Sequence, residues 1–243
     1  MDRRLVVLVC MVGLLTGYPA LAGWVLVDDF ESGDSFGGGT HGTVADPTDP
    51  ANTVLSFSGG TSTMGLSGAT EIPDGSDGTL YFEALLPDLG TDVSFGVTDQ
   101  GTNWGDYIAQ VMFLPDEIRA RNGNGSGGGP ADLIIDPAIA GDWYQFWLVI
   151  DEAAANYDVY GAGPGLTGTA LLATDLGFRR TSNPGALDTL LLKEGGFGSG
   201  PVYFDNVYVD PTRANTGAVP EPATLSLLGL GGLAALLRRR RRR

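Results

Sequence analysis

The chain has 243 residues and a formal net charge of −15 at pH 7. Removing the eight basic and two acidic residues of its two ends leaves a middle with six basic and 27 acidic residues, a charge of −21. A domain this acidic repels nucleic acid phosphates and anionic lipid headgroups, so we expect no nucleic acid partner. Cys10 is the only cysteine and lies in the N-terminal apolar run, which excludes disulfides, thiolate catalysis and cysteine-ligated metals in the exported protein.

The N-terminus has the pattern of a secretory signal peptide. Met1–Arg4 is basic, Leu5–Gly17 is apolar, and Ala20-Leu21-Ala22 has the small-x-small pattern of a cleavage site, which places the mature start at Gly23. The apolar run is too short for a first transmembrane helix. We therefore expect residues 1–22 to form a signal peptide helix that signal peptidase removes.

Residues 23–211 have the pattern of one all-β domain, an antiparallel jelly-roll sandwich. Glycine is abundant, no long run has helical periodicity, and short β-rich segments alternate with turns rich in Gly, Asp, Asn and Pro. The length suffices for one large core. We predict strands at Trp24–Phe30, Thr53–Ser58, Thr61–Leu66, Gly78–Leu86, Asp92–Thr98, Tyr107–Phe113, Glu117–Arg121, Leu133–Ile135, Trp143–Asp151, Asn156–Gly161, Leu187–Lys193 and Pro201–Val209.

Three segments depart from this strand pattern. Along Val202–Val209 the period of two fails near Asp205 and Asn206, which predicts a β-bulge. Asn122–Gly129 is rich in glycine, but it has no lysine and no helix follows it, so we expect a flexible hairpin tip and not a phosphate-binding loop. Residues 212–218 form a short polar linker.

The C-terminal segment 219–243 has three parts. The motif Val219-Pro220-Glu221-Pro222 precedes an apolar run, Ala223–Leu237, and the chain ends in Arg238, Arg239, Arg240, Arg241, Arg242 and Arg243. We expect the apolar run to enter the membrane as a helix, because the arginines stay on the cytoplasmic side. Its 15 residues span about 22 Å as a helix, whereas a stable span needs about 20 residues. The length therefore favours a temporary anchor.

This order of motif, apolar segment and basic cluster resembles the PEP-CTERM sorting signal of Gram-negative bacteria. The resemblance implies that an exosortase recognises the motif and processes the protein while it is held transiently in the inner membrane. The product would then reside at the cell surface or in the extracellular matrix, including a biofilm matrix. A permanent transmembrane anchor is the alternative, and a mature protein that keeps all six arginines would indicate it.

Three segments of the body resemble the concanavalin A-like jelly roll of lectins, laminin-G domains and glucanases. They are Asp28-Asp29-Phe30-Glu31 in the opening strand, the hairpin pattern from Trp143 to Tyr160, and Phe204-Asp205-Asn206-Val207 in the closing strand. The resemblance implies that the first and last strands pair. Pairing would bring the two ends of the domain together and hold it on a single linker above the membrane.

The residues point to no catalytic centre. Glucanases of this fold place carboxylates on one strand as Glu-x-Asp-x-x-Glu, because alternate strand residues share a face, and the chain has no such run. His41 is the only histidine, which is too few for a typical zinc site, and no Gly-x-Ser-x-Gly segment accompanies it. We expect a surface histidine in a flexible loop. A divergent glycoside hydrolase or lyase stays open as the alternative.

Asp28, Asp29, Asp205 and Asn206 are candidate ligands of a structural calcium ion. Ca²⁺ prefers carboxylate and carbonyl oxygens, and paired first and last strands would bring these side chains together. The alternative is that they cap turns and solvate loops. No other cofactor or metal is expected.

Trp104, Tyr107 and Tyr144 are candidates for stacking on sugar rings. The alternative is that the aromatic residues are packed, since most aromatic residues of β proteins lie in the core. Trp143, Phe146 and Trp147 would then be core residues, and Trp104 would plug a loop. We therefore predict an exported, surface-sorted, non-catalytic domain that binds extracellular polysaccharide or has a structural or adhesive role.

Overall fold

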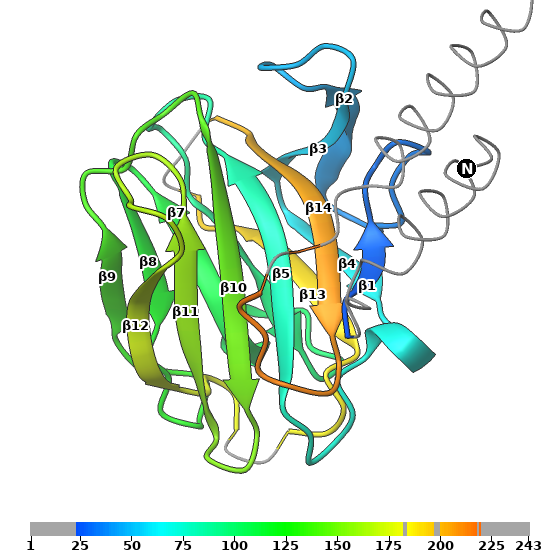
Figure 1. Cartoon of the computed structure of the whole chain (residues 1–243), viewed down its shortest axis with the longest axis vertical. Coiled ribbons are helices and arrows are strands. Elements are labelled where there is room, and N and C mark those ends of the chain that lie inside the picture. Colours follow the sequence, from blue (N-terminus) through cyan, green and yellow to red (C-terminus); the bar gives the residue numbers. More distant parts are fainter. Residues whose placement is uncertain (1–22, 182–183, 197–199, 218, 220–243) are drawn as a thin grey trace, which may run out of the picture. The chain divides into compact units, whose positions relative to one another are not determined.

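The structure is a computed structural model, and it describes residues 23–181, 184–196, 200–217 and 219 (Figure 1). The predicted signal peptide, with the cleavage residues Ala20 and Ala22, lies outside the described residues. So do residues 220–243 of the predicted sorting signal. Among the described residues, no helix has the length and apolar character needed to cross a membrane. Val25–Gly217 forms one compact unit, and this unit is the body of the protein.

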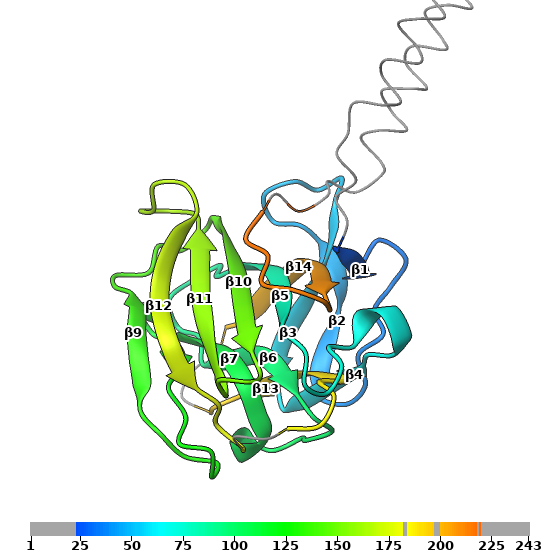
Figure 2. The same ribbon diagram turned by 60° about the horizontal axis from the view of Figure 1, so that its bottom comes forward.

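The body consists of two antiparallel sheets, which confirms the predicted all-β sandwich. The eight-stranded sheet has the order β12-β11-β10-β5-β14-β3-β2, with β1 also paired to β14, and the six-stranded sheet has the order β4-β13-β6-β7-β8-β9. Figure 2 shows β6, β7 and β13 in a separate layer from β10, β5 and β14. The strands are β1 Val25–Asp28, β2 Thr40–Ala45, β3 Thr53–Gly59, β4 Thr61–Gly65, β5 Gly78–Leu85, β6 Val93–Thr98, β7 Tyr107–Leu114, β8 Glu117–Arg121, β9 Ala131–Ile135, β10 Trp143–Asp151, β11 Asn156–Ala162, β12 Ala170–Gly177, β13 Thr189–Glu194 and β14 Val202–Asp210. Two short 3₁₀ helices, Gly68–Thr70 and Trp104–Asp106, lie between strands.

Every predicted strand is present, but two strands were missed, β2 and β12. They are the two edges of the eight-stranded sheet. None of the side chains of β2 is buried, and β12 buries only Leu176 and contains Asp175 at φ 55°. An edge strand need not alternate apolar and polar residues, and its sequence therefore lacks the period of two on which the prediction relied.

The first and last strands pair, as the concanavalin A-like resemblance implied. Val25 lies opposite Val209 and Leu26 opposite Tyr208 in an antiparallel register, and Figure 1 shows β1 next to β14. The strand that opens the body is thus held by the strand that leads into the polar linker.

The predicted bulge in β14 is also present. Asp205 pairs with Glu83, but the next pair is Tyr208 with Tyr81, so β14 has one residue more than β5 between these pairs. Asn206 has φ 50°, a left-handed conformation that asparagine tolerates better than most residues. The extra residue lets Asp205 and Asn206 both reach the same side of the sheet.

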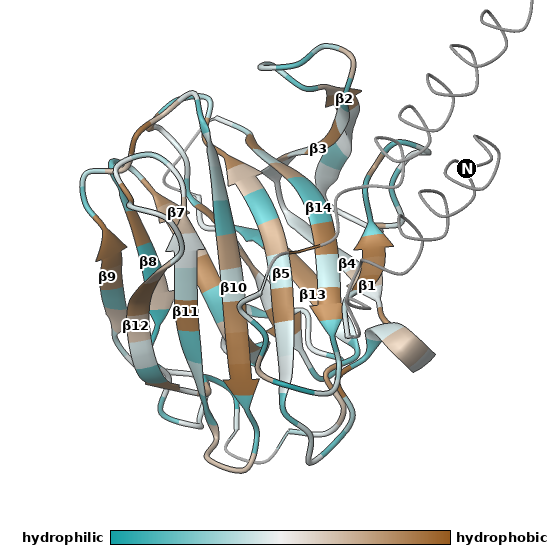
Figure 3. Cartoon of the chain, viewed as in Figure 1, coloured by the Kyte–Doolittle hydropathy of each residue, from teal (hydrophilic) through white to brown (hydrophobic). Residues whose placement is uncertain are grey.

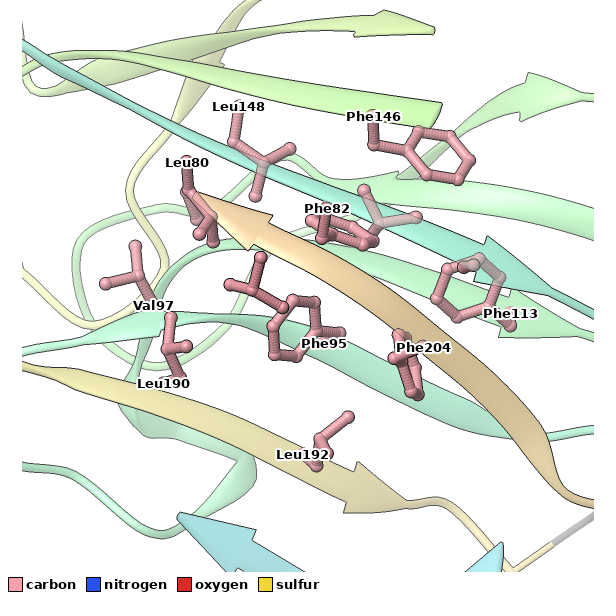
Figure 4. Packing of buried hydrophobic residues seen from close by; sticks show 14 of the residues in the cluster. Leu80, Phe82, Phe95, Val97, Phe113, Phe146, Leu148, Leu190, Leu192 and Phe204 are labelled. Atoms are coloured by element: carbon pink, nitrogen blue, oxygen red, sulfur yellow. The ribbon is translucent and has the colours of Figure 1, made fainter. Parts of the chain in front are cut away.

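Five phenylalanines form the centre of the core between the sheets (Figure 4). Phe82, Phe146 and Phe204 come from the eight-stranded sheet, and Phe95 and Phe113 come from the six-stranded sheet. The rings of Phe82 and Phe95 meet edge to face across the interface with centroids 4.5 Å apart. Apolar and polar bands alternate along β5 and β14 in Figure 3, as expected for strands with one face in the core.

Candidate functional site

The outer face of the eight-stranded sheet carries three rows of side chains that point away from the core. Leu80, Phe82 and Ala84 of β5 face inward, and their alternates therefore face outward. Strand pairing aligns these alternates with outward residues of β10 and β14. The rows are Trp143–Leu85–Tyr203, Gln145–Glu83–Asp205 and Trp147–Tyr81–Tyr208. We call these nine residues, together with Asn206, the outer-face site.

Glu83 is the centre of the middle row. Its Oε1 accepts hydrogen bonds from the Tyr81 hydroxyl at 2.5 Å and from Gln145 Nε2 at 3.1 Å. Its Oε2 accepts one from Asn206 Nδ2 at 3.2 Å. The same amide nitrogen donates to Asp205 Oδ2, also at 3.2 Å. One side-chain amide thus bridges two carboxyl groups, whose oxygens lie at most twice that distance apart.

Asp205 is nearly inaccessible, with 4% of its surface exposed. It accepts hydrogen bonds from Asn52 Nδ2 at 2.9 Å and from its neighbour Asn206 N at 2.8 Å. Burial raises the pKa of Asp205 to about 7, because desolvation outweighs these hydrogen bonds and the nearby charge of Glu83 adds to it. Near neutral pH this carboxyl group can hold or release a proton.

The third row is aromatic and buried. The ring of Tyr81 lies 4.9 Å from that of Trp147 and 6.2 Å from that of Tyr208. Burial raises the pKa of Tyr208 to about 12 and that of Tyr81 further, so both phenols stay protonated. The Nε1 of Trp147 is buried and has no hydrogen-bond partner among the described residues, which is costly for a donor away from water.

The first row supplies the accessible aromatic surface. Trp143 and Tyr203 are half-buried, and the Nε1 of Trp143 donates to Thr48 Oγ1 at 3.2 Å. The alternative that placed Trp143 in the core is therefore wrong. It and Trp147 both alternate with the core residues of β10. Sequence reasoning had the signal for this site in the alternation of β5, but it could not tell which strands lie beside β5.

Two of the three predicted sugar-stacking residues are buried, and that prediction was wrong for them. The hydroxyl of Tyr107 donates to the carbonyls of Ser94 at 3.1 Å and Leu191 at 3.2 Å, inside the six-stranded sheet. Tyr144 lies in the core, and its hydroxyl oxygen accepts a hydrogen bond from Ile139 N at 2.8 Å. Neither ring can meet a ligand.

Trp104 differs from the other two, since it is half-buried. It lies in the 3₁₀ helix before β7, and its ring is 6.3 Å from that of Tyr107. Lys193 Nζ lies 5.9 Å from the centre of its indole ring. Trp104 thus keeps a surface that a ligand can reach, on the sheet opposite to the outer-face site.

Two of the four predicted calcium ligands, Asp28 and Asp29, cap turns, and the other two, Asp205 and Asn206, belong to the outer-face site. Asp28 Oδ1 accepts a hydrogen bond from Phe30 N at 2.8 Å, and Asp29 Oδ1 accepts one from Glu31 N at 3.3 Å. Among the described residues, no group of three or more His, Cys, Asp or Glu side chains is placed to hold a metal ion. The calcium site stays a prediction. Unfolding midpoints in millimolar calcium and in chelator test it, because an ion bound to the native state must raise the midpoint.

His41 is not in a flexible loop, contrary to the prediction. It lies in β2, and its side chain is only 14% exposed. Its Nδ1 is 3.0 Å from Ser62 Oγ, and its Nε2 is 3.2 Å from Asp34 Oδ1. This arrangement contains the residue types of a catalytic triad, but Ser62 is fully buried and its hydroxyl donates to Gly38 O at 2.7 Å. A substrate cannot reach the hydroxyl, so the cluster joins β2 to β4.

Residues 218–242 match the PEP-CTERM protein-sorting motif. The match confirms the predicted sorting signal and implies an exported protein that an exosortase processes. It covers the C-terminal tail and does not bear on the ligand of the body. No curated protein matches the chain.

Several solved structures resemble the body at low identity. The lectin UEA-II complexed with galactose is 11% identical with a TM-score of 0.48, over 77% of this chain and 95% of that one. The cellulose induced protein Cip1 is 14% identical with a TM-score of 0.46, over 78% and 99%. The binding domain of Paraclostridial Mosquitocidal Protein 1 is 11% identical with a TM-score of 0.47, over 74% of this chain but only 44% of that one. The chain likewise spans 30% of the Trypanosoma rangeli sialidase structure. These values are too low to transfer a function.

Proposed function

We propose that the protein is sorted to the surface or extracellular matrix of a Gram-negative bacterium and binds polysaccharide there through the outer-face site, without cleaving it. The observation that carries the proposal is the row of hydrogen-bonding side chains between two aromatic rows. Sugars present hydroxyl groups at their edges and apolar C–H groups on their ring faces. A carboxylate and amides that alternate with aromatic rings match both features.

The accessible part of the site is suited to this role. Glu83, Gln145 and Asn206 are half-buried, as are Trp143 and Tyr203 in the adjoining row. Hydrogen bonds within the middle row fix the side chains before a ligand arrives, which lowers the entropy cost of binding. The buried third row lies beside them, and its Tyr81 hydroxyl donates a hydrogen bond to Glu83.

The test is binding of neutral polysaccharides to the purified protein, first on a glycan array and then by calorimetry. Trp143→Ala removes the accessible ring, and we expect it to weaken binding at least tenfold. Trp104→Ala is the matched control, since it removes a half-buried tryptophan from the opposite sheet and should leave this binding unchanged. An array without any bound neutral glycan, or an equal loss in both variants, would contradict the proposal.

Glycoside hydrolysis is the second candidate, and the spacing of Glu83 and Asp205 favours it. Their bridged oxygens are each 3.2 Å from the same amide nitrogen, which allows the separation of about 5–5.5 Å found in retaining enzymes. A protonated Asp205 would give its proton to the leaving oxygen as the glycosidic bond breaks. Glu83 would attack the anomeric carbon, and water would then hydrolyse the glycosyl ester. The burial of Asp205 argues against this route, because the proton donor must reach the substrate.

An assay for new reducing ends separates the two candidates. Sustained release by the wild-type protein that disappears in both Glu83→Gln and Asp205→Asn would establish hydrolysis. A bound polysaccharide that stays intact through prolonged incubation supports the binding role.

A further inference from the structure

The outer face of the six-stranded sheet collects positive charge in a domain that is otherwise strongly acidic. The segment 23–217 has six basic residues. Arg119 and Arg121 of β8 and Lys193 of β13 alternate with core residues and therefore face outward. Arg179, just after β12, reaches the same face through Gln110 of β7. Four of the six basic side chains thus lie on one side of one sheet.

A cavity of about 440 Å³ opens on this face. Its volume falls within the about 300–1,000 Å³ of ligand pockets. Its walls include an aromatic ring, a thioether, two cations and two acids: Trp104, Met112, Arg121, Arg179, Asp92 and Glu117. The cavity lies on the opposite sheet from the outer-face site and shares no residue with it.

Neutral groups hold both arginines in place. Arg121 Nη1 donates to Gly129 O at 2.9 Å. Arg179 Nε donates to Gly127 O at 3.1 Å, and its Nη1 donates to Gln110 Oε1 at 3.0 Å. These two glycine carbonyls belong to the segment Asn122–Gly129, which we predicted to be a flexible hairpin tip. Its backbone therefore holds both arginine side chains in place. Neither guanidinium forms an ion pair with any carboxylate of the described residues.

The two arginines have hydrogen-bonding capacity left over. Each guanidinium has five N–H donors, and the Nε of Arg121 is buried with no acceptor among the described residues. Burial lowers the pKa of both side chains, and the positive charge of Arg121 lowers that of Arg179 further. An anion between them would accept the unused hydrogen bonds and relieve the repulsion.

The acids of the cavity do not cancel this charge. Glu117 is engaged by Arg119, whose Nε and Nη2 donate to its two oxygens at 2.6 and 3.0 Å. Asp92 is the other acid of the lining, and the three cations Arg121, Arg179 and Lys193 outnumber it. Lys193 adds a cation above the Trp104 ring. The balance around the cavity is therefore positive.

We propose that this cavity binds a sugar residue with a carboxylate or sulfate group, the anionic group against Arg121 and Arg179 and the ring against Trp104. Paired guanidinium groups recognise planar or tetrahedral oxyanions through bidentate hydrogen bonds, and an indole face packs against a sugar ring. The site lets an acidic domain hold an acidic polysaccharide at one place while the rest of its surface repels it.

Calorimetric titration of the purified protein with an oligogalacturonate tests the proposal, at about 0.15 M salt so that long-range repulsion is screened. We expect saturable binding that weakens at least tenfold in Arg179→Gln. The loss should be smaller in Arg179→Lys, which keeps the positive charge but cannot donate bidentate hydrogen bonds from a planar guanidinium. Arg213→Gln is the matched control, because it removes a charge from the segment after β14 and should bind as the wild type does. Equal binding by wild type and Arg179→Gln would overturn the proposal.

Three further readouts guard against a folding artefact and an unspecific anion effect. In the wild-type protein, the Nε–H resonance of Arg121 should shift during the titration, and an unmoved resonance overturns the assignment. Sodium acetate and sodium sulfate should bind far more weakly than the oligogalacturonate, and equal affinity for either small anion would overturn the proposed recognition of a sugar ring. Trp143→Ala should still bind the oligogalacturonate, so failure at the outer-face site and failure here are distinguishable.

Discussion

The two outer faces of the sandwich obey the same alternation but present opposite chemistry. On the eight-stranded sheet, Glu83 is an anion surrounded by three donors. On the six-stranded sheet, Arg121 is a cation with a buried donor and no acceptor for it. In the outer-face site the carboxylate of Glu83 is matched by neutral donors, which suits neutral hydroxyl groups, whereas neither Arg121 nor Arg179 has an ion-pair partner among the described residues. One core between the sheets supports two surfaces that can change independently.

The largest effect is expected from a substitution in the core between the sheets, because the outer faces of both sheets depend on it. Phe82 contacts rings of both sheets at the centre of the core, so Phe82→Ala should lower the free energy of unfolding by about 3–5 kcal/mol. Both kinds of sugar binding should fail together near the lowered melting temperature. Chemical denaturation measures the change. Leu171→Ala on β12, where the side chain is 53% exposed, is the control and should stay within about 0.5 kcal/mol. A loss below about 1 kcal/mol in Phe82→Ala would contradict the shared core.

The sequence predicts the sandwich well because apolar and polar residues alternate along most strands. It does not predict which side chains meet on the outer face of either sheet. Leu80, Phe82 and Ala84 define the inner side of β5, which already turns Tyr81 and Glu83 outward. The partners of Tyr81 and Glu83 on the neighbouring strands cannot be inferred from this alternation. Asn206, for example, lies 123 residues after Glu83 in the chain, and only the strand order brings it next to β5. Tyr107 and Tyr144 failed as surface predictions since an aromatic residue suits a core and a binding surface equally well.

The second prediction separates the two faces. A Cβ at Gly123 would lie 2.2 Å from the Cα of Arg179 and 2.4 Å from its N, and backbone atoms cannot yield without moving the strand. Gly123→Ala should therefore cost about 3 kcal/mol and abolish binding of the oligogalacturonate. Neutral glycan binding should persist, since the outer-face site is on the other sheet.

Gly42→Ala is the control for that substitution. Its Cβ would meet no atom within 4 Å, so it should leave stability and both binding activities unchanged. If Gly123→Ala also retains its affinity for the oligogalacturonate, the hydrogen bond from Arg179 to the Gly127 carbonyl is not needed to position Arg179 for binding.

The third prediction concerns the proton on Asp205. Its folded-state pKa is about 7, above the ordinary value of 3.8, so the folded protein binds the proton more tightly than the unfolded chain does. This group therefore favours the folded state at low pH, and the advantage falls as the pH rises from about 4 to 7. Asp205→Asn removes the titration. Relative to wild type, its unfolding free energy should rise by about 3 kcal/mol over this window. A difference that does not change with pH in urea titrations would mean that Asp205 is ionised throughout.

The smallest effect concerns Tyr107, whose ring lies 6.3 Å from that of Trp104. Tyr107→Phe removes a hydroxyl that donates to two carbonyls of the six-stranded sheet, and we expect a loss of about 1 kcal/mol. Tyr160→Phe is the matched control, because the Tyr160 hydroxyl has no hydrogen bond to the rest of the described chain, and its stability should not change. Both variants should bind the oligogalacturonate as the wild type does, since Tyr107 is buried and does not line the cavity. A tenfold loss of that affinity in Tyr107→Phe alone would instead make its hydroxyl part of the binding site and reverse the assignment of this residue to the packed interior.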